Sequence, residues 1–292
     1  MKQIKIGTCV PGTKAEEWLK GFAGKGFETF SINFHMSLEG TDLDKLALST
    51  EKLLAGTDSK ITTVGYYCNP IQYADHRKTL EKVICTAEKF GATHVSTFAG
   101  AWEGKPVESA YEEFGKVFRE LADLAEEKGV KLGIENCLMD GTWEHATCNI
   151  GFNPKAWEVM FEEVKNDNFG LEWEPTHQMV QLIDPVTELR KWCKKIVHIH
   201  GKDATIDWDA VRHSGISGAV PFVWHRMPGF GDTNWRDIIS ILRSNGYEDD
   251  ICIEGYHDPV YSGELEMTGQ LHALNYLKWC RGGEFTPTPW AK

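Results

Sequence analysis

Carboxylates and histidines that could do chemistry lie at the ends of four consecutive predicted strands, the fifth to the eighth of the chain. They are Glu135 on one strand, Glu172, Glu174 and His177 on the next, His198 and His200 on the third, and Glu254 on the fourth. Each group comes with a run of apolar residues, which places it at the end of a buried strand. Buried carboxylates without partners cost several kcal/mol, and a shared cation keeps them ionised. The pattern therefore predicts one divalent metal site.

The donors of this predicted site would be three carboxylates and one imidazole. An oxygen-rich set of this kind suits Mn²⁺, Mg²⁺ or Co²⁺ better than a thiolate-type zinc site does. We expect Mn²⁺, with Mg²⁺, Co²⁺ and Zn²⁺ as alternatives. Glu172 and Glu174 share one face of their strand by alternation, so either could supply the carboxylate there. The alternative without a metal pairs these carboxylates with lysine or arginine at the rim of the fold.

Eight short runs rich in β-branched residues would hold these side chains in place. They are Ile4–Val10, Glu28–His35, Ile61–Cys68, His94–Ala99, Lys131–Asn136, Phe169–Pro175, Ile196–Gly201 and Ile251–Gly255. Amphipathic stretches such as Arg77–Phe90 and Tyr111–Glu127 separate them, and their apolar residues recur with the period of a helix. Strands that alternate with helices indicate parallel pairing with right-handed crossovers. Eight such units predict closure into a (β/α)₈ TIM barrel, an α/β fold of about this length.

The helix ends and the even composition of the chain indicate one domain. Glycine follows four predicted helices where a left-handed cap is expected, at Gly26, Gly91, Gly129 and Gly246. A doubly wound open sheet is the alternative, but no GxGxxG pattern follows Ile4–Val10. We expect a single barrel domain over residues 1–283 and a polar tail over residues 284–292.

The active site of such a barrel lies at the C-terminal ends of its strands. The loop 137–151 after the fifth strand holds Trp143 and His145, so His145 could act as a general acid or base and Trp143 could form a wall of the pocket. A rim loop with a solvated histidine is the alternative. Further candidates for the pocket lining are Asn33, His35, Tyr66 and Trp102. His198 sits one pleat deeper than His200, which indicates a hydrogen-bonding role behind the site.

Composition and charge argue against several classes of protein. The chain has 31 lysines and arginines and a net charge of −12, whereas nucleic-acid binders need a basic face to displace phosphate counterions. We find no long apolar run and no apolar signal core, so we expect neither membrane spanning nor secretion. The eight cysteines form no CxxC pair and predict reduced thiols in the cytoplasm. We expect a small-molecule partner, and the sequence is compatible with a homo-oligomer.

A series of ordered motifs resembles one family of barrels. The motifs are Ile134-Glu135-Asn136-Cys137, Glu174-Pro175-Thr176-His177, His198-Ile199-His200-Gly201-Lys202-Asp203, Arg226-Met227-Pro228-Gly229-Phe230-Gly231 and the segment Trp235–Glu254. They are similar to the xylose-isomerase-like superfamily of sugar isomerases and epimerases. By that resemblance, the metal ligands are Glu135, Glu174, His200 and Glu254. The resemblance also implies that His177 and Arg226 contact the substrate and that Lys202 is a further site residue.

The sequence departs from the family pattern at two points. The ligand on the sixth strand is usually aspartate, and Glu174 carries one more methylene. The family often reads Glu-His-Glu-Asp near the eighth strand, where this chain continues from Glu254 with Gly255-Tyr256-His257-Asp258. The resemblance therefore assigns no role to His257 and Asp258.

The resemblance implies proton transfer on a sugar-like substrate. A divalent ion would polarise a carbonyl and stabilise an enediolate, with Glu135 and Glu254 as both ligands and acid/base pair. We expect a metal-dependent isomerase or epimerase of keto-sugars or polyols. The alternative is a metal-dependent lyase, dehydratase or hydratase acting on a keto-sugar, an inosose or a 3-oxo-glycoside. Two other classes of protein are disfavoured. An apurinic-site endonuclease shares the barrel but needs more metal-binding histidines and a basic groove. A non-catalytic binding subunit would not need four metal ligands.

Overall fold

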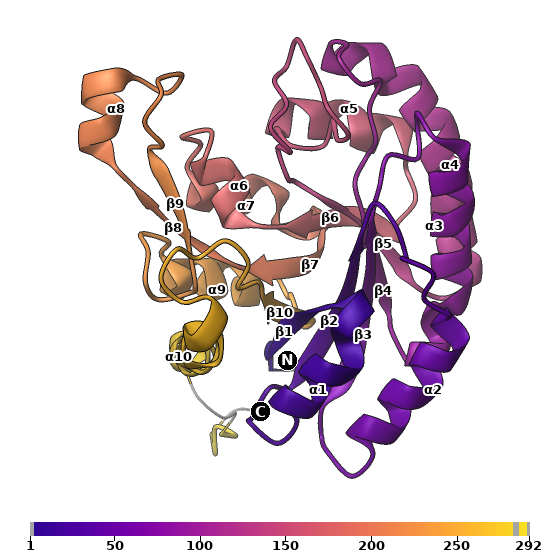
Figure 1. Cartoon of the computed structure of the whole chain (residues 1–292), viewed down its shortest axis with the longest axis vertical. Helices are drawn as coiled ribbons and strands as arrows, with labels where there is room; N and C mark the ends of the chain where they lie inside the picture. The colour runs from indigo at the N-terminus through magenta and orange to yellow at the C-terminus, as the bar shows by residue number, and fades with distance from the viewer. Residues whose placement is uncertain (1–2, 283–285, 291–292) are drawn as a thin grey trace.

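Eight parallel strands close into a barrel in this computed structural model, which describes residues 3–282 and 286–290. Around the barrel the strand order is β1-β10-β7-β6-β5-β4-β3-β2. The strands are β1 (Lys5–Pro11), β2 (Thr29–His35), β3 (Lys60–Tyr67), β4 (His94–Thr97), β5 (Lys131–Glu135), β6 (Phe169–Trp173), β7 (Ile196–Gly201) and β10 (Asp250–Ile253). Each matches one predicted strand to within a few residues, so the predicted (β/α)₈ barrel is confirmed (Figure 1).

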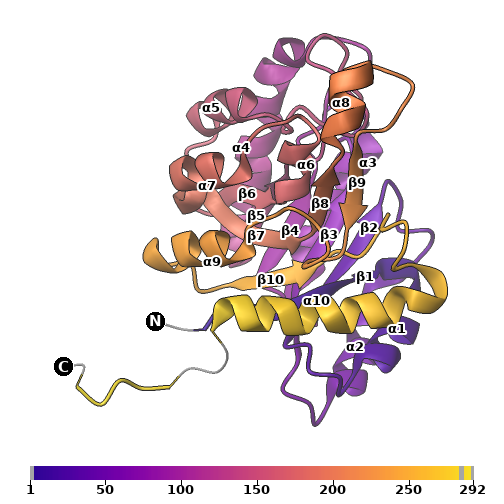
Figure 2. The ribbon, with the colours of Figure 1, turned by 90° about the vertical axis from the view of Figure 1, so that its left-hand side faces the viewer.

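Helices follow the strands and cover the outside of the barrel (Figure 2). They are α1 (Ala15–Phe22), α2 (Leu43–Leu54), α3 (Ala74–Thr86), α4 (Tyr111–Glu127), α5 (Pro154–Glu163), α6 (Pro175–Met179), α7 (Pro185–Trp192), α9 (Trp235–Ser244) and α10 (Glu266–Arg281). The stretch predicted at Arg77–Phe90 is α3 followed by the 3₁₀ helix η2 (Ala87–Phe90). The predicted left-handed glycine caps are confirmed at Gly91, Gly129 and Gly246, with φ of +71°, +67° and +79°. Gly26 also has a left-handed φ of +96°, but α1 ends at Phe22 with Ala23 as its cap, so the cap predicted at Gly26 is wrong.

The two layers of the fold are filled by different kinds of side chain. Large apolar residues such as Trp157, Trp173 and Trp235 are fully buried between the barrel and its helices. In most TIM barrels branched apolar residues also fill the interior. Polar side chains fill part of the interior here, among them Thr29, Ser31, His94, Glu172, His198, Asp250 and Cys252. This polar interior lies directly beneath the predicted site.

A hairpin arm, defined here as residues 203–226, projects beyond the strand ends (Figure 1). β8 (Asp203–Ile206) pairs antiparallel with β9 (Val223–Arg226), and α8 (Trp208–Ser214) lies between them. None of the residues in α8 is buried. This arm leaves no periodic signal in the sequence, because its strands of four residues are too short to show one.

The C-terminal helix α10 runs along the side of the barrel next to β1 and β10 (Figure 2). Arg281 at its end donates to the carbonyl oxygen of Ile4 at 2.7 Å and to Oε2 of Glu28 at 2.6 Å. The domain boundary expected at residues 283–284 falls outside the described residues and stays a prediction. Within the described part of the chain, no helix is long and apolar enough to cross a membrane.

Candidate active site

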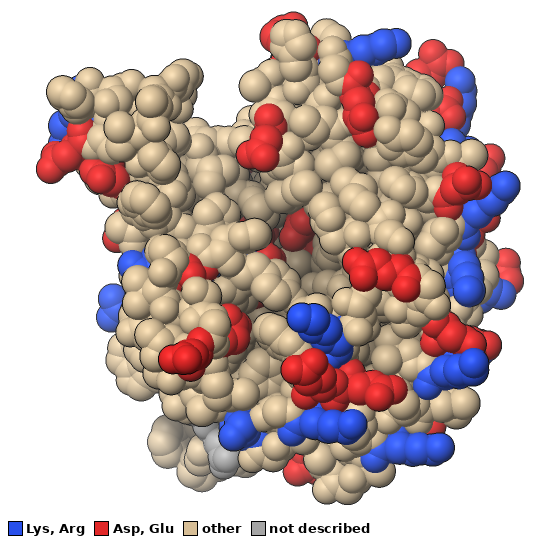
Figure 3. Space-filling model, in the orientation of Figure 1, with Lys and Arg blue, Asp and Glu red and all other residues tan. Residues whose placement is uncertain are grey.

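A cavity of about 790 Å³ opens at the C-terminal ends of the barrel strands. All four strands predicted to carry ligands contribute residues to its lining, either in the strand or just after it. These residues are Glu135, His177, His200, Lys202 and Glu254. Figure 3 shows the hollow from outside, between the arm and the body of the molecule. Lysines and arginines on this face lie mostly along its top, right and lower edges, interspersed with acidic residues, rather than around the hollow. The hollow therefore offers no basic groove on this face.

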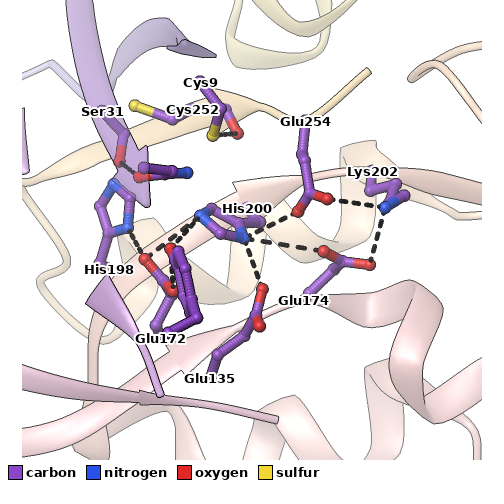
Figure 4. A network of polar contacts seen from close by, with 12 residues as sticks. Cys9, Ser31, Glu135, Glu172, Glu174, His198, His200, Lys202, Cys252 and Glu254 are labelled. Atoms are coloured by element: carbon purple, nitrogen blue, oxygen red, sulfur yellow. Dashed lines mark hydrogen bonds and ion pairs between the residues drawn. The ribbon is translucent and has the colours of Figure 1, made fainter. Parts of the chain in front are cut away.

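Three carboxylates and one imidazole meet at the floor of this cavity. Glu135 is the last residue of β5, Glu174 directly follows β6, His200 lies in β7, and Glu254 directly follows β10. Nδ1 of His200 lies 2.9 Å from Oε1 of Glu135, 2.9 Å from Oε2 of Glu254 and 3.7 Å from Oε2 of Glu174. The four donor atoms all lie within 4.8 Å of one another. Figure 4 shows the four side chains pointing toward this common centre. The structure thus brings together the four residues predicted as ligands.

Glu172, the rival for the position of Glu174, lies behind the imidazole of His200. Its Oε2 accepts a hydrogen bond from the hydroxyl of Tyr67 at 2.8 Å. Its Oε1 lies 2.6 Å from Nδ1 of His198 and 3.2 Å from Nε2 of His200 (Figure 4). Because these contacts occupy both oxygens, Glu172 is not free to join the four-residue group, whereas Glu174 is.

The ring of His200 is oriented by this contact. Nε2 faces Glu172 and the hydroxyl of Tyr67, and Nδ1 faces the three carboxylates. Burial opposes a charge on His200, but the negative charge of Glu172 outweighs it and holds the pKa of the imidazole well above its usual value. With Nε2–H directed at Glu172, the lone pair of Nδ1 would be available to a cation, the arrangement common for histidine ligands.

The buried oxygens at the floor fit a divalent cation. Both oxygens of Glu174 and Oε2 of Glu254 are buried and make no hydrogen bond within the described part of the chain. Burial raises the pKa of Glu174 well above its usual range, against the charge of Lys202. Lys202 is itself buried, with Nζ 2.8 Å from Oε1 of Glu254 and 4.0 Å from Oε1 of Glu174. The raised pKa values of Glu174 and His200 mean that protons offset the charge of this cluster in the metal-free protein. A divalent ion would displace those protons and neutralise the carboxylates in their place.

Three histidines form one wall of the cavity. The ring centroids of His177 and His225 are 6.4 Å apart, and those of His225 and His257 are 6.0 Å apart. Burial lowers the pKa of all three, to about 4 for His225, so each is neutral at neutral pH. His257 has a φ of +72°, a left-handed conformation that is uncommon outside glycine and often found at functional sites. Neutral imidazoles can donate to and accept from hydroxyl groups.

Other predicted substrate contacts fall into two groups. His35, His177 and Lys202 line the cavity. Arg226 does not, because it forms an ion pair with Asp258 at 3.4 Å and lies over a neighbouring aromatic ring. The adjacent residue on β9, His225, faces the cavity instead, since neighbouring residues of a strand point to opposite sides.

The structure also places Trp102 and His145 away from the cavity. Trp102 packs against the apolar core, and His145 is exposed on the loop 137–151. Trp143 of the same loop donates its indole N–H to Glu108 and packs edge-on against Phe152. The loop contacts the body of the fold in this region, so we leave these residues out of the proposed site.

Sequence reasoning missed several residues that line the cavity. Tyr67 lines it rather than the expected Tyr66, and His225, Cys137 and Tyr256 were assigned no role there. The register of β3 against the neighbouring β2, which carries the expected lining residue Asn33, shows in the structure why Tyr67 faces the cavity. Asn33 pairs in register with Gly65, two residues before Tyr67, so Tyr67 shares the inward face.

A closed parallel barrel with ionisable side chains at the C-terminal ends of its strands is the architecture of TIM-barrel enzymes. The model of the xylose isomerase-like TIM barrel family matches residues 22–278, and the chain belongs to this family. Inosose dehydratase of Clostridium tetani (strain Massachusetts / E88) is 26% identical over 227 residues, which cover 75% of this chain and 72% of the relative.

Solved structures with the same fold include two with informative names. The 3-keto-D-glucoside 4-epimerase of E. coli has a TM-score of 0.70 and 15% identity, and the match covers 95% of this chain and 100% of the epimerase. The IolI protein with a bound zinc atom has a TM-score of 0.65 and 20% identity, and the match covers 95% of this chain and 96% of IolI. At these identities the structures support the fold alone.

Proposed function

We propose that this chain is a metal-dependent lyase that removes water from a keto-polyol of the inosose class. The observation that carries the proposal is the set of buried carboxylate oxygens without hydrogen-bond partners around Nδ1 of His200. A relative that matches three quarters of this chain is named inosose dehydratase. From the sequence we expected an isomerase or epimerase, with the lyase as the alternative, and the curated relatives support the lyase better.

The proposed metal ligands are Glu135, Glu174, His200 and Glu254. A divalent ion bound by them would act as a Lewis acid on the substrate carbonyl and its neighbouring hydroxyl. The oxygen-rich donors favour Mn²⁺, and the zinc atom bound to IolI makes Zn²⁺ the first alternative to compare.

Glu135 and Glu254 are the proposed acid and base. β5 and β10 are not neighbours in the barrel, so the two carboxylates reach the centre from different sides. In dehydration, one carboxylate accepts the proton from the carbon beside the carbonyl, and the C–H electrons form the new C=C bond. The hydroxyl on the next carbon then leaves as water with a proton from the other carboxyl group. Lys202 fixes the side chain of Glu254 through the 2.8 Å contact.

The cavity wall supports an uncharged polyhydroxylated substrate. Of the described lining residues, Lys202 alone carries a permanent positive charge, and Glu254 already pairs with it. A phosphate would find no free cation among these residues. The neutral side chains of His177, His225 and His257 instead offer hydrogen bonds to hydroxyl groups.

Epimerisation is the second candidate. The same two flanking carboxylates could remove a proton on one face of the substrate and return one on the other, with no group expelled. The placement of Glu135 and Glu254 on non-adjacent strands favours such two-sided proton transfer.

Incubation of the Mn²⁺-loaded protein with keto-inositols in D₂O tests the proposal. We expect loss of one water from the substrate and a new enone absorbance, and Glu135→Gln should abolish both. Deuterium incorporation without loss of water would overturn the lyase in favour of the epimerase. If neither change occurs across a panel of keto-inositols and keto-sugars at full metal occupancy, the enzymatic proposal is wrong.

A further inference from the structure

Cys137 brings a thiol to the edge of the carboxylate cluster. It lies two residues after Glu135, at the start of the loop that follows β5, and it lines the cavity in a partly exposed position. A carboxylate oxygen of Glu135, Sγ of Cys137 and a ring nitrogen of His177 all lie within 4.8 Å of one another. This trio shares Glu135 with the four-residue cluster but is otherwise separate from it.

The side chains of the trio are placed to accept an ion. Neither ring nitrogen of His177 makes a hydrogen bond within the described residues, although Nε2 lies 3.3 Å from Oε1 of Glu174. Oε1 of Glu135 is the oxygen that contacts His200. Glu135 therefore has a second oxygen that could face the trio, and bridging carboxylates of this kind occur where two metal ions lie about 3.5–4 Å apart. Because the trio lines the cavity, an ion can reach it from solvent.

We propose that Glu135, Cys137 and His177 form a second divalent-cation site, selective for zinc-like ions. One sulfur, one nitrogen and one oxygen donor are typical of zinc, whereas the oxygen-rich cluster beside them suits Mn²⁺ or Mg²⁺. Donor atoms around a tetrahedral zinc lie about 3.5 Å apart. Side-chain rotations that move the three donor atoms by roughly 1 Å would therefore complete the geometry and leave the fourth position open.

Occupation of this site would inhibit turnover, a consequence that rests on the proposed function. The ion would hold His177, a proposed substrate contact, and would compete for Glu135, a proposed acid or base. The site would thus make the protein sensitive to zinc even when Mn²⁺ fills the oxygen-rich cluster.

Titration with Co²⁺ alone tests the site through a signal that does not depend on activity. Thiolate-bound Co²⁺ gives a near-ultraviolet charge-transfer band, which the oxygen and nitrogen donors of the other cluster cannot give. We expect the wild type to bind two equivalents and to show the band, and Cys137→Ser to bind one equivalent without the band. Cys148→Ser is the matched control, because Cys148 packs in the same small apolar cluster as Cys137 but belongs to no such trio. It should retain both equivalents and the band.

Two further measurements separate this proposal from the proposed function. Glu174→Gln removes a ligand of the oxygen-rich cluster only, so it should keep the thiolate band while losing one equivalent of Co²⁺. Turnover is then measured with Mn²⁺ and increasing Zn²⁺, and each variant's rate is compared with its own rate without zinc. The Zn²⁺ concentration that halves the rate should be at least about 100-fold higher for Cys137→Ser than for the wild type, because losing a ligand costs more than losing an outer partner. A wild type without the band, or a band that persists in Cys137→Ser, would overturn the second site whatever the fate of the lyase.

Discussion

Replacement of Tyr67 by phenylalanine should weaken metal binding without removing a proposed ligand. The hydroxyl of Tyr67 donates to Oε2 of Glu172 at 2.8 Å and lies 3.2 Å from Nε2 of His200. A hydrogen bond to a charged group contributes about 1.5–3 kcal/mol, and each 1.4 kcal/mol corresponds to about tenfold in affinity. Because the bond is also present without metal, only the part of its energy that orients His200 affects binding, and its loss should raise the Kd for Mn²⁺ by about 10- to 100-fold, the range typical of outer partners of metal ligands.

The assay is competition between the protein and a chelator for Mn²⁺, well below the melting temperature so that the variant stays folded. Tyr66→Phe is the matched control, because the hydroxyl of Tyr66 donates to the carbonyl oxygen of Met36, outside the cluster. Its affinity for Mn²⁺ should equal that of the wild type. If folded Tyr67→Phe binds Mn²⁺ as tightly as the wild type, then the contact between Tyr67 and Glu172 does not orient His200, and the argument is refuted.

Three other substitutions test the structure. Glu174→Gln should abolish the stabilisation of the protein by Mn²⁺. Without metal the variant should be at least as stable as the wild type, because an amide replaces a buried carboxylate that makes no hydrogen bonds. Melting temperatures measured with EDTA and with Mn²⁺ check these two results. Arg281→Ala should lower the free energy of unfolding in urea by about 2–3 kcal/mol, because Glu28 and the carbonyl oxygen of Ile4 lose their buried guanidinium donor. His94, whose Nε2 lies 3.7 Å from Oδ2 of Asp249, and Lys131, which donates to that oxygen at 2.9 Å, lower the pKa of Asp249 against the effect of burial, so Asp249→Asn should destabilise the protein at neutral pH. That deficit should begin to shrink as the pH falls below about 4, the usual value for aspartate, and should vanish only below the lower pKa of the folded wild type, where its carboxylate also takes up a proton. A deficit independent of pH would contradict the ion pair.

The fold could be predicted from the sequence because alternation of strands and helices leaves few topologies. The carboxylates and histidine of the candidate site could be predicted for a related reason. Parallel strands in a barrel end on one side, so residues far apart in the chain, such as Glu135 and Glu254, must lie close together. Glycines at helix ends added an independent check, since their left-handed backbone is a local requirement.

The face of a strand that points inward could not be predicted from apolar pattern. Strands of a parallel barrel are buried on both sides and show no alternation, so Tyr66 and Tyr67 look equivalent in the sequence. The same one-residue ambiguity separates Arg226 from His225 on β9. The arm itself left no signal, because α8 buries no residue and its flanking strands are short.

The polar interior of the barrel links the stability of the protein to its candidate site. His198 lies 2.6 Å from Glu172 and 3.5 Å from Asp250, so a row of buried polar contacts fixes Glu172, and Glu172 fixes the ring of His200. Apolar residues of similar volume would often stabilise a core more, but they could not orient an imidazole. The unpartnered oxygens of Glu174 add a further cost to the metal-free state. A bound ion at 100 times its Kd would stabilise the folded state by about 2.7 kcal/mol, so metal at the mouth should raise the melting temperature of the whole barrel.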